Sequence, residues 1–219
     1  FYANWYQLPM DYSGFFHARN HLINKTSNHN KRLLESNPYL ALFTKELSDY
    51  YPNGKIIILL RDPRKVVLSH YNKGWYTDYD PSFSNWGKAP FYQYEITQPN
   101  HFFGRFFPNE EHSFKEWSQL TQVGKISWMW QAVNNKIKRA IQSVDQNKIR
   151  VVNIDHFNYD QYLALNHFLE LDDGLSKANF DQLVQSAPGH TVAKTYKSWG
   201  KLEEEEFQLQ INKFEGFTD

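Results

Sequence analysis

The sequence predicts an α/β domain with a central parallel sheet flanked by helices. Two short apolar runs, residues 55–60 and 149–154, have the length and β-branched content of buried strands. Segments with helical spacing of apolar residues lie before and after each run, an alternation typical of parallel α/β sheets. The chain has 219 residues, which suits a single domain over residues 1–219.

The first helix–strand–helix unit is bounded by clear capping signals. Asn37 can cap a helix that has Pro38 at its first position. Residues 55–60 are continuously apolar after Lys55, so we expect a strand buried on both faces, as in a parallel sheet. Asp62 and Pro63 then form a second cap and first-turn pair, which opens the next helix.

The second unit repeats this order nearer the end of the chain. Apolar residues from Trp130 to Val144 recur with helical spacing, and the strand at 149–154 follows. Tyr162, Leu165 and Leu169 mark the next helix. Four consecutive glutamates, residues 203–206, open a last helix, because carboxylates are favourable at the positive end of the helix dipole.

Between the two units, residues 76–125 look like an irregular insertion rich in aromatic side chains and prolines. A long loop of this kind is often functional. We expect residues 75–118 either to pack as an additional subdomain or to cover an acceptor-binding site.

The composition excludes several classes of protein. Lys plus Arg and Asp plus Glu are both 24, so the chain lacks the basic excess that nucleic-acid binding needs. No apolar run approaches the length of a membrane span in this segment. The absence of Cys excludes a thiolate zinc site and favours a reducing compartment such as the cytoplasm. We expect no metal, since i, i+4 ligand spacing is absent among His70, His101, His112, His156, His167 and His190.

Arg61 and Ser69 are the strongest candidates for a binding site. Arg61 directly follows the first strand, and ligands of open α/β sheets bind at the carboxyl ends of strands. Its rigid fork of donors suits a phosphate. Ser69 lies about two turns into the next helix, so its hydroxyl can face the same crevice. The alternative is that Arg61 pairs with a carboxylate and Ser69 is ordinary helix surface.

The stretch from Lys55 to Ser69 resembles the 3′-phosphate-binding motif of sulfotransferases that use 3′-phosphoadenosine 5′-phosphosulfate (PAPS). That motif is a strand, then Arg-Asp-Pro-Arg, then a Ser eight residues after the first Arg, and residues 61–64 and Ser69 match it. The resemblance implies a P-loop-type sulfotransferase fold with PAPS as donor and 3′-phosphoadenosine 5′-phosphate (PAP) as product. Arg61 and Ser69 would hold the 3′-phosphate, and the acceptor would be a small molecule or a glycan.

Weaker resemblances extend over about residues 22–215. Residues 25–29 resemble the family's Lys-Thr-Pro segment, although Ser27 replaces the Pro. By this resemblance Lys25 would contact the phosphosulfate, where a cation stabilises the negative charge that develops on transfer. His29 falls on a family position and is the first choice for the base that removes the acceptor's proton, with His17, His21 and Glu35 as alternatives. Lys194, in the loop before a late Trp that also resembles the family's, would add a donor to the nucleotide phosphates.

One family feature is not visible in this sequence. The family's first strand leads into a Gly/Ser/Thr-rich loop that cradles the 5′-phosphosulfate at a helix N-terminus. The chain starts at Phe1 instead of Met, so we expect that an N-terminal strand and loop are missing. An anchor lost with them would place the protein in the Golgi lumen. Two alternatives stay open: another nucleotide-dependent phosphoryl transferase, and a non-catalytic module with a sulfotransferase-like fold.

Overall fold

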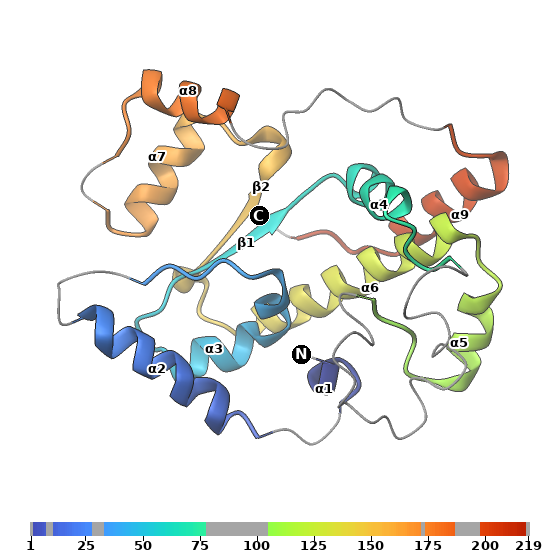
Figure 1. Ribbon diagram of the computed structural model, residues 1–219, viewed down its shortest axis with the longest axis horizontal. Helices are drawn as coiled ribbons and strands as arrows, with labels where there is room; N and C mark the ends of the chain where they lie inside the picture. The colour runs from blue at the N-terminus through green and yellow to red at the C-terminus, as the bar shows by residue number, and fades with distance from the viewer. Residues whose placement is uncertain are drawn as a thin grey trace.

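The computed structural model describes residues 2–7, 11–27, 33–77, 105–171, 174–186 and 198–217. Within these ranges the protein is mixed α/β and mostly helical, with one two-stranded parallel sheet (Figure 1). Its elements in chain order are α1 (Tyr2–Trp5), α2 (Ser13–Ser27), the 3-10 helix η1 (Pro38–Phe43), α3 (Thr44–Tyr50), β1 (Ile56–Leu60), α4 (Pro63–Asn72), α5 (Glu111–Ser118), α6 (Gln122–Gln142), η3 (Gln146–Lys148), β2 (Ile149–Asn153), η4 (Ile154–His156), α7 (Tyr159–Phe168), α8 (Lys177–Ser186) and α9 (Lys201–Ile211).

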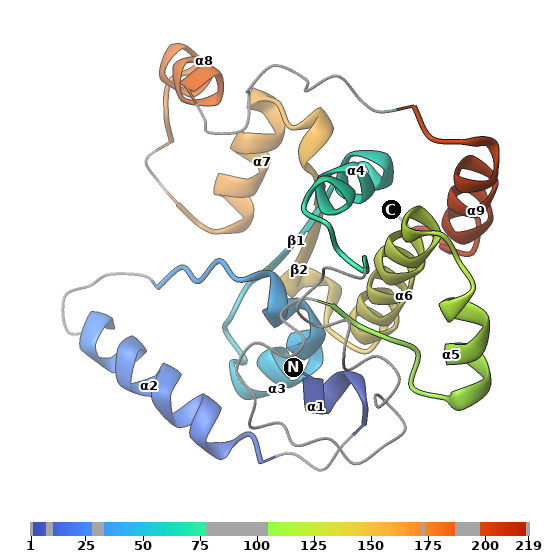
Figure 2. The ribbon, with the colours of Figure 1, turned by 45° about the vertical axis from the view of Figure 1, so that its right-hand side comes forward.

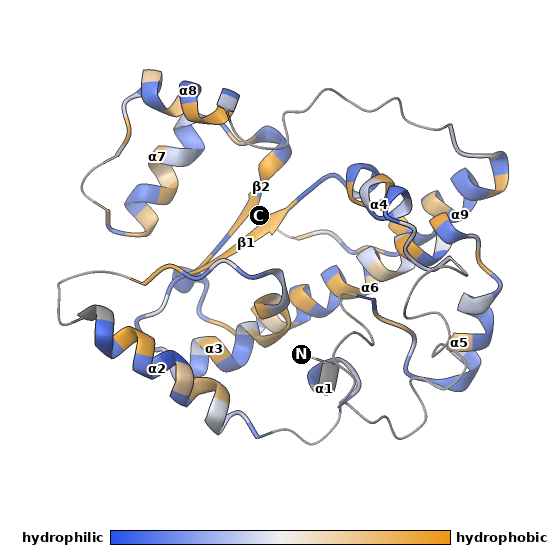
Figure 3. Cartoon of the chain, viewed as in Figure 1, coloured by the Kyte–Doolittle hydropathy of each residue, from blue (hydrophilic) through white to orange (hydrophobic). Residues whose placement is uncertain are grey.

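The two predicted strands form the sheet. β1 and β2 pair in parallel, with Ile56 opposite Ile149 and Leu60 opposite Asn153. β1 is apolar throughout, whereas β2 also contains Arg150 and Asn153 (Figure 3). One face of the sheet packs against the long helix α6. The core between them contains Ile58, Ile137, Ile141, Val144 and Ile149. The predicted parallel sheet with flanking helices is therefore confirmed in this small form.

The prediction that β1 is buried on both faces is wrong. Leu59 is 61% exposed, on the face of β1 opposite Ile58. On that face, the ring of Phe168 from α7 lies beneath the cations of Lys55 and Arg150. This contact covers the amino-terminal part of the strand pair and leaves Leu59, near the carboxyl end, open to solvent.

Both predicted N-caps are present. The Asn37 side chain accepts a hydrogen bond from the Tyr39 N–H, and Asp62 accepts one from the Lys65 N–H. The segment after Asn37 differs from the single helix that the spacing suggests, because it forms the 3-10 helix η1 before it continues as α3. Asp62 opens α4 as predicted.

The expectation of an irregular insertion is wrong for residues 105–125. Helix α5 lies within this range, and α6 begins at Gln122, where Thr121 caps it through a hydrogen bond from the Gly124 N–H. The flanking rings of Phe107 and Trp117 are buried in the main core, with centroids 5.3 Å apart and nearly perpendicular planes. The central part of the insertion, residues 78–104, lies outside the described residues.

The four glutamates of α9 make separate contacts in addition to their position at the helix start. Glu203 accepts a hydrogen bond from the Gly200 N–H at the start of the helix, while Glu204 accepts two hydrogen bonds from the Arg64 guanidinium. Glu206 accepts hydrogen bonds from the backbone N–H and the hydroxyl of Thr121. Helix α9 therefore fastens the starts of α4 and α6, which it neighbours in Figure 2. None of the helices described here is long and apolar enough to cross a membrane.

Candidate functional site at the carboxyl edge of the sheet

The parallel pairing brings the loops after β1 and β2 to one edge of the sheet. β1 ends at Leu60 and β2 ends at Asn153, its partner in the register. Arg61 and Asp62 therefore leave the sheet beside Ile154 and Asp155. This carboxyl edge is where open α/β sheets bind ligands.

Asp155 joins the two loops. Its Oδ2 accepts a hydrogen bond of 2.5 Å from the backbone N–H of Asp62, and its Oδ1 lies 2.6 Å from Nζ of Lys65. Burial raises the pKa of the Asp155 carboxyl, but the Asp62 N–H and the Lys65 ammonium outweigh it, so the pKa is lowered overall. The carboxylate stays charged at neutral pH and fixes the backbone next to Arg61.

Arg61 is exposed at this edge and carries no hydrogen bond or ion pair within the described residues. It lies near enough to Asp155 to lower the pKa of that carboxyl, together with Lys65. The two basic residues that follow are both engaged, Arg64 with Glu204 and Lys65 with Asp155. Of these three cations, Arg61 is the one whose donors are left for a ligand.

Ser69 is half-buried on α4, seven residues after the cap Asp62. At 100° per residue this places the two on nearly the same face of the helix, two turns apart. The Ser69 hydroxyl makes no hydrogen bond with other described residues, Arg61 included. A ligand held by both groups would have to bridge them.

The next residue, His70, lies against the ring of Trp75. The two ring centroids are 3.8 Å apart and the planes are nearly parallel. Burial lowers the pKa of His70 to about 4, and the nearby cations of Lys73 and Arg105 add to this effect. His70 is therefore neutral at physiological pH and adds no charge beside Ser69.

The other predicted site residues are not brought to this edge by the described chain. Lys25 is exposed in the last turn of α2. Helix α2 lies apart from α4 in both views of the molecule (Figures 1 and 2). His29 and Lys194 lie outside the described residues, so their predicted roles stay predictions.

A cavity of about 450 Å³ is lined in part by residues that closely follow Asp155 in the sequence. It lies between the start of α7 and α8, and Phe157, two residues after Asp155, is one of its walls. Arg61 and Ser69 do not line it. The described residues contain no group of three or more His, Asp or Glu side chains that could hold a metal ion.

Comparison with known proteins finds no matching family model, no matching curated protein and no matching solved structure. The sulfotransferase assignment therefore remains a proposal that rests on the motif at residues 55–69 and on the site around it.

Sequence reasoning missed the role of Asp155 and Lys65. A signal for the role of Asp155 was present, because Asp62 and Asp155 both lie within two residues of the end of a predicted parallel strand. Residues at matching positions after neighbouring parallel strands meet at one edge. No sequence signal indicated that Lys65 pairs with Asp155, because this pairing depends on the direction in which α4 leaves the sheet.

Proposed function

We propose that this protein is a sulfotransferase, which transfers a sulfuryl group from PAPS to a hydroxyl or amine acceptor. The observation that carries the proposal is the state of Arg61. It ends a parallel strand at the ligand-binding edge, and its guanidinium is unpaired among the described residues, whereas Arg64 and Lys65 are both held by carboxylates. A strong donor fork left open at this position is suited to an anionic ligand.

Two features support the 3′-phosphate as that anion. A guanidinium can donate two parallel hydrogen bonds to phosphate oxygens, and these charge-assisted bonds are stronger than neutral ones. The Ser69 hydroxyl, also unpaired within the described chain, supplies a further donor on α4. Asp155 holds the Asp62 backbone in place, so Arg61 projects from a fixed point.

In the proposed reaction the acceptor oxygen or nitrogen forms a bond to sulfur, while the bond from sulfur to the bridging oxygen of PAPS breaks. PAP leaves with the electron pair of that bond, and a base takes the proton from the acceptor. By the family resemblance, Lys25 would stabilise the leaving charge, His29 would be the base and Lys194 would contact the nucleotide. The acceptor would bind beneath residues 75–118.

The proposal is tested by titrating PAP into the protein in a calorimeter and by following its melting temperature with PAP present. We expect saturable binding and a rise in melting temperature, both strongly reduced in Arg61→Ala. Arg61→Lys should recover only part of the affinity, because a lysine keeps the charge but loses the fork. Ser69→Ala should weaken binding by a smaller factor.

Arg139→Ala is the matched control. Arg139 is an exposed arginine on α6 whose side chain has no partner among the described residues, so its loss should leave PAP binding unchanged. Equal losses in Arg61→Ala and Arg139→Ala would indicate non-specific attraction of an anion and contradict the proposal. No binding of PAP by a folded protein would favour a non-catalytic module with this fold.

A further inference from the structure

A second cavity, of about 270 Å³, lies between the first half of α2 and the 3-10 helix η1. Its walls are mostly aromatic or aliphatic, and three polar side chains lie among them. The lining residues are Asp11, Tyr12, Phe15, Arg19, Asn37, Tyr39, Leu40 and Phe43. Neither view places α2 beside α4, so this cavity is separate from the carboxyl edge (Figures 1 and 2). We propose that it binds an uncharged aromatic ring that carries an amide-like pair of hydrogen-bond donor and acceptor.

The aromatic walls select a flat ring. Phe15 and Phe43 stack with centroids 5.2 Å apart and planes 21° apart, while Tyr12 meets Phe43 edge-on at 5.9 Å. Phe43 is buried, and Phe15 and Tyr12 are half-buried. Because Phe15 and Phe43 stack on each other and Arg19 lies over the Phe15 ring, a ligand meets these walls mainly at ring edges. A cavity of this size suits one planar ring system, which gains edge contacts of this kind.

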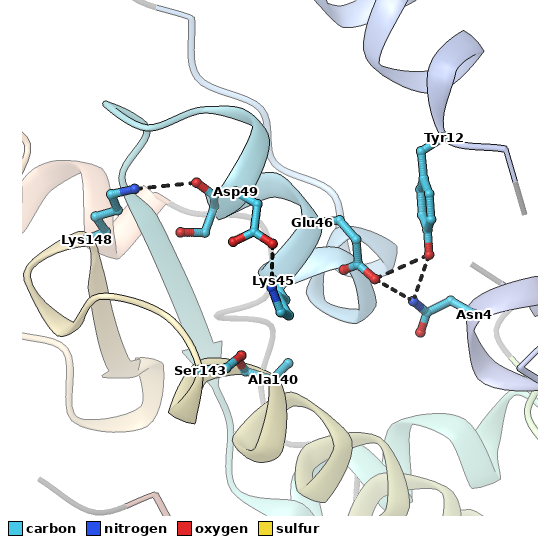
Figure 4. A network of polar contacts seen from close by, with 9 residues as sticks. Asn4, Tyr12, Lys45, Glu46, Asp49, Ala140, Ser143 and Lys148 are labelled. Atoms are coloured by element: carbon cyan, nitrogen blue, oxygen red, sulfur yellow. Dashed lines mark hydrogen bonds and ion pairs between the residues drawn. The ribbon is translucent and has the colours of Figure 1, made fainter.

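The walls are fixed before any ligand arrives. The Tyr12 hydroxyl donates to Oε1 of Glu46 at 3.2 Å, and Asn4 donates to the same oxygen (Figure 4). Arg19 donates two hydrogen bonds to Glu35, and its guanidinium lies 3.5 Å from the centre of the Phe15 ring. These contacts hold α2 against the following segments, so little ordering entropy is lost on binding.

The charges of the lining residues exclude a charged ring. The Arg19 cation is neutralised by Glu35 in a bidentate pair, so it offers little attraction to an anion. Asp11 is a carboxylate whose pKa is lowered by hydrogen bonds from the backbone and hydroxyl of Ser13, and it repels an anion. A cation would meet the single exposed Asp11 beside the Arg19 guanidinium, so it gains little.

Two of the polar lining residues, Asn37 and Asp11, can serve a ligand as a hydrogen-bond donor and an acceptor. Asn37 uses its Oδ1 to cap η1 through the Tyr39 N–H, which leaves its Nδ2 donors without a partner in the described chain. Each Asp11 oxygen accepts one hydrogen bond from Ser13 and retains acceptor capacity. A ligand amide matches both, since its carbonyl accepts from Asn37 and its N–H donates to Asp11.

Benzamide is the probe, measured by calorimetry and by saturation-transfer NMR on the unmodified protein. We expect saturable binding with a Kd on the order of 1 mM or tighter, as is usual for a ligand of this size. Cyclohexanecarboxamide keeps the amide and loses the flat ring, and benzoate keeps the ring and adds a negative charge. Each should bind at least about fivefold more weakly than benzamide.

Three variants locate the binding. Leu40→Trp should fill the cavity and abolish binding. Asn37→Asp keeps the capping oxygen and removes the Nδ2 donors, so it should weaken binding roughly three- to tenfold, the range of one hydrogen bond, while circular dichroism shows the fold intact. Asp160→Asn, in α7, is the control and should change nothing.

Equal binding of benzamide and cyclohexanecarboxamide would overturn the proposal, as would benzamide binding that survives Leu40→Trp. Should Leu40→Trp fail to fold, Asn37→Asp alone decides: unchanged affinity in that variant contradicts the proposal. PAP binding at Arg61 is measured separately, so failure here leaves the sulfotransferase proposal untouched.

Discussion

The carboxylate of Asp155 accepts a hydrogen bond from the backbone N–H of Asp62, which lies 93 positions earlier in the chain. The same carboxylate contacts the ammonium of Lys65. One side chain therefore connects the loops after both strands and orients the start of α4, where Arg61 and Ser69 are expected to bind phosphate.

Loss of this connection should weaken both the fold and the site. We expect Asp155→Ala to lower the free energy of unfolding by about 1–2 kcal/mol, because the Asp62 N–H loses a charged acceptor and the Asp155 side chain, which is only 12% exposed, is removed. Lys65→Ala should cost less, since its ammonium is exposed and its ion pair is screened by solvent. Urea denaturation of the two variants tests the order, and a larger loss in Lys65→Ala would contradict it.

Arg64 should stabilise the protein more through packing than through charge. Its guanidinium lies 4.7 Å from the Trp199 ring centre and 4.6 Å from that of Phe207, in addition to its pair with Glu204. Both partners of the ion pair are about two-fifths exposed, so a double-mutant cycle of Arg64→Ala and Glu204→Gln should give a coupling of no more than about 1 kcal/mol.

In the same cycle, Arg64→Ala alone should be more destabilising than Glu204→Gln, because it also removes the contacts with two rings. Equal losses from the two single substitutions would show that the rings contribute nothing.

Gly124 should not tolerate a methyl group, although an exposed helix usually gains from replacing Gly with Ala. A Cβ at this position of α6 would lie 3.0 Å from the Cβ of Leu120 and would collide with the Glu206 carboxylate. That carboxylate accepts two hydrogen bonds from Thr121, the N-cap of α6, so its displacement also breaks these bonds. We expect Gly124→Ala to destabilise the protein by about 1–3 kcal/mol in chemical denaturation.

The combination Gly124→Ala with Glu206→Ala separates the two causes. Because the second substitution removes the colliding carboxylate, the pair should cost less than the sum of the single changes. Additive losses would place the strain at Leu120 instead.

The buried His70 should make stability depend on pH. Its pKa is about 4 in the folded protein against an ordinary value of 6.5, so between these values the unfolded chain binds a proton that the folded chain does not. Stability from this group is complete above pH 6.5 and declines as the pH falls toward 4, by about 3 kcal/mol at most. His70→Phe keeps an aromatic ring against Trp75 and should remove this part of the decline. An identical pH profile in that variant would contradict the prediction.

The sequence predicted those features that local chemistry determines. Asn37 and Asp62 were recognisable as caps because each precedes a proline at the first helical position, and the strands were recognisable as short runs rich in Ile and Val. The exposure of Leu59 was not predictable, because it depends on which elements cover the second face of the sheet. Helix α5 was missed because the aromatic residues around it mask a short helical pattern.

In the candidate site, too, some features follow from the local sequence and others depend on tertiary contacts. The position of Arg61 follows from the end of a strand. That its guanidinium is unpaired among the described residues depends on tertiary contacts, which pair Arg64 and Lys65 with carboxylates. Arg64 pairs with Glu204, 140 residues away, and Lys65 pairs with Asp155, 90 residues away. No local pattern indicates which of three nearby cations is left unpaired.

The central claim is that Arg61 holds the 3′-phosphate of a nucleotide, and a cycle of variant and ligand tests it most directly. PAP and adenosine 5′-monophosphate, which lacks the 3′-phosphate, are titrated into the unmodified protein and into Arg61→Ala. We predict that the substitution weakens PAP binding by about 1.5–3 kcal/mol and leaves the weaker binding of the monophosphate unchanged. Equal losses for both nucleotides, or none for PAP, would contradict the claim.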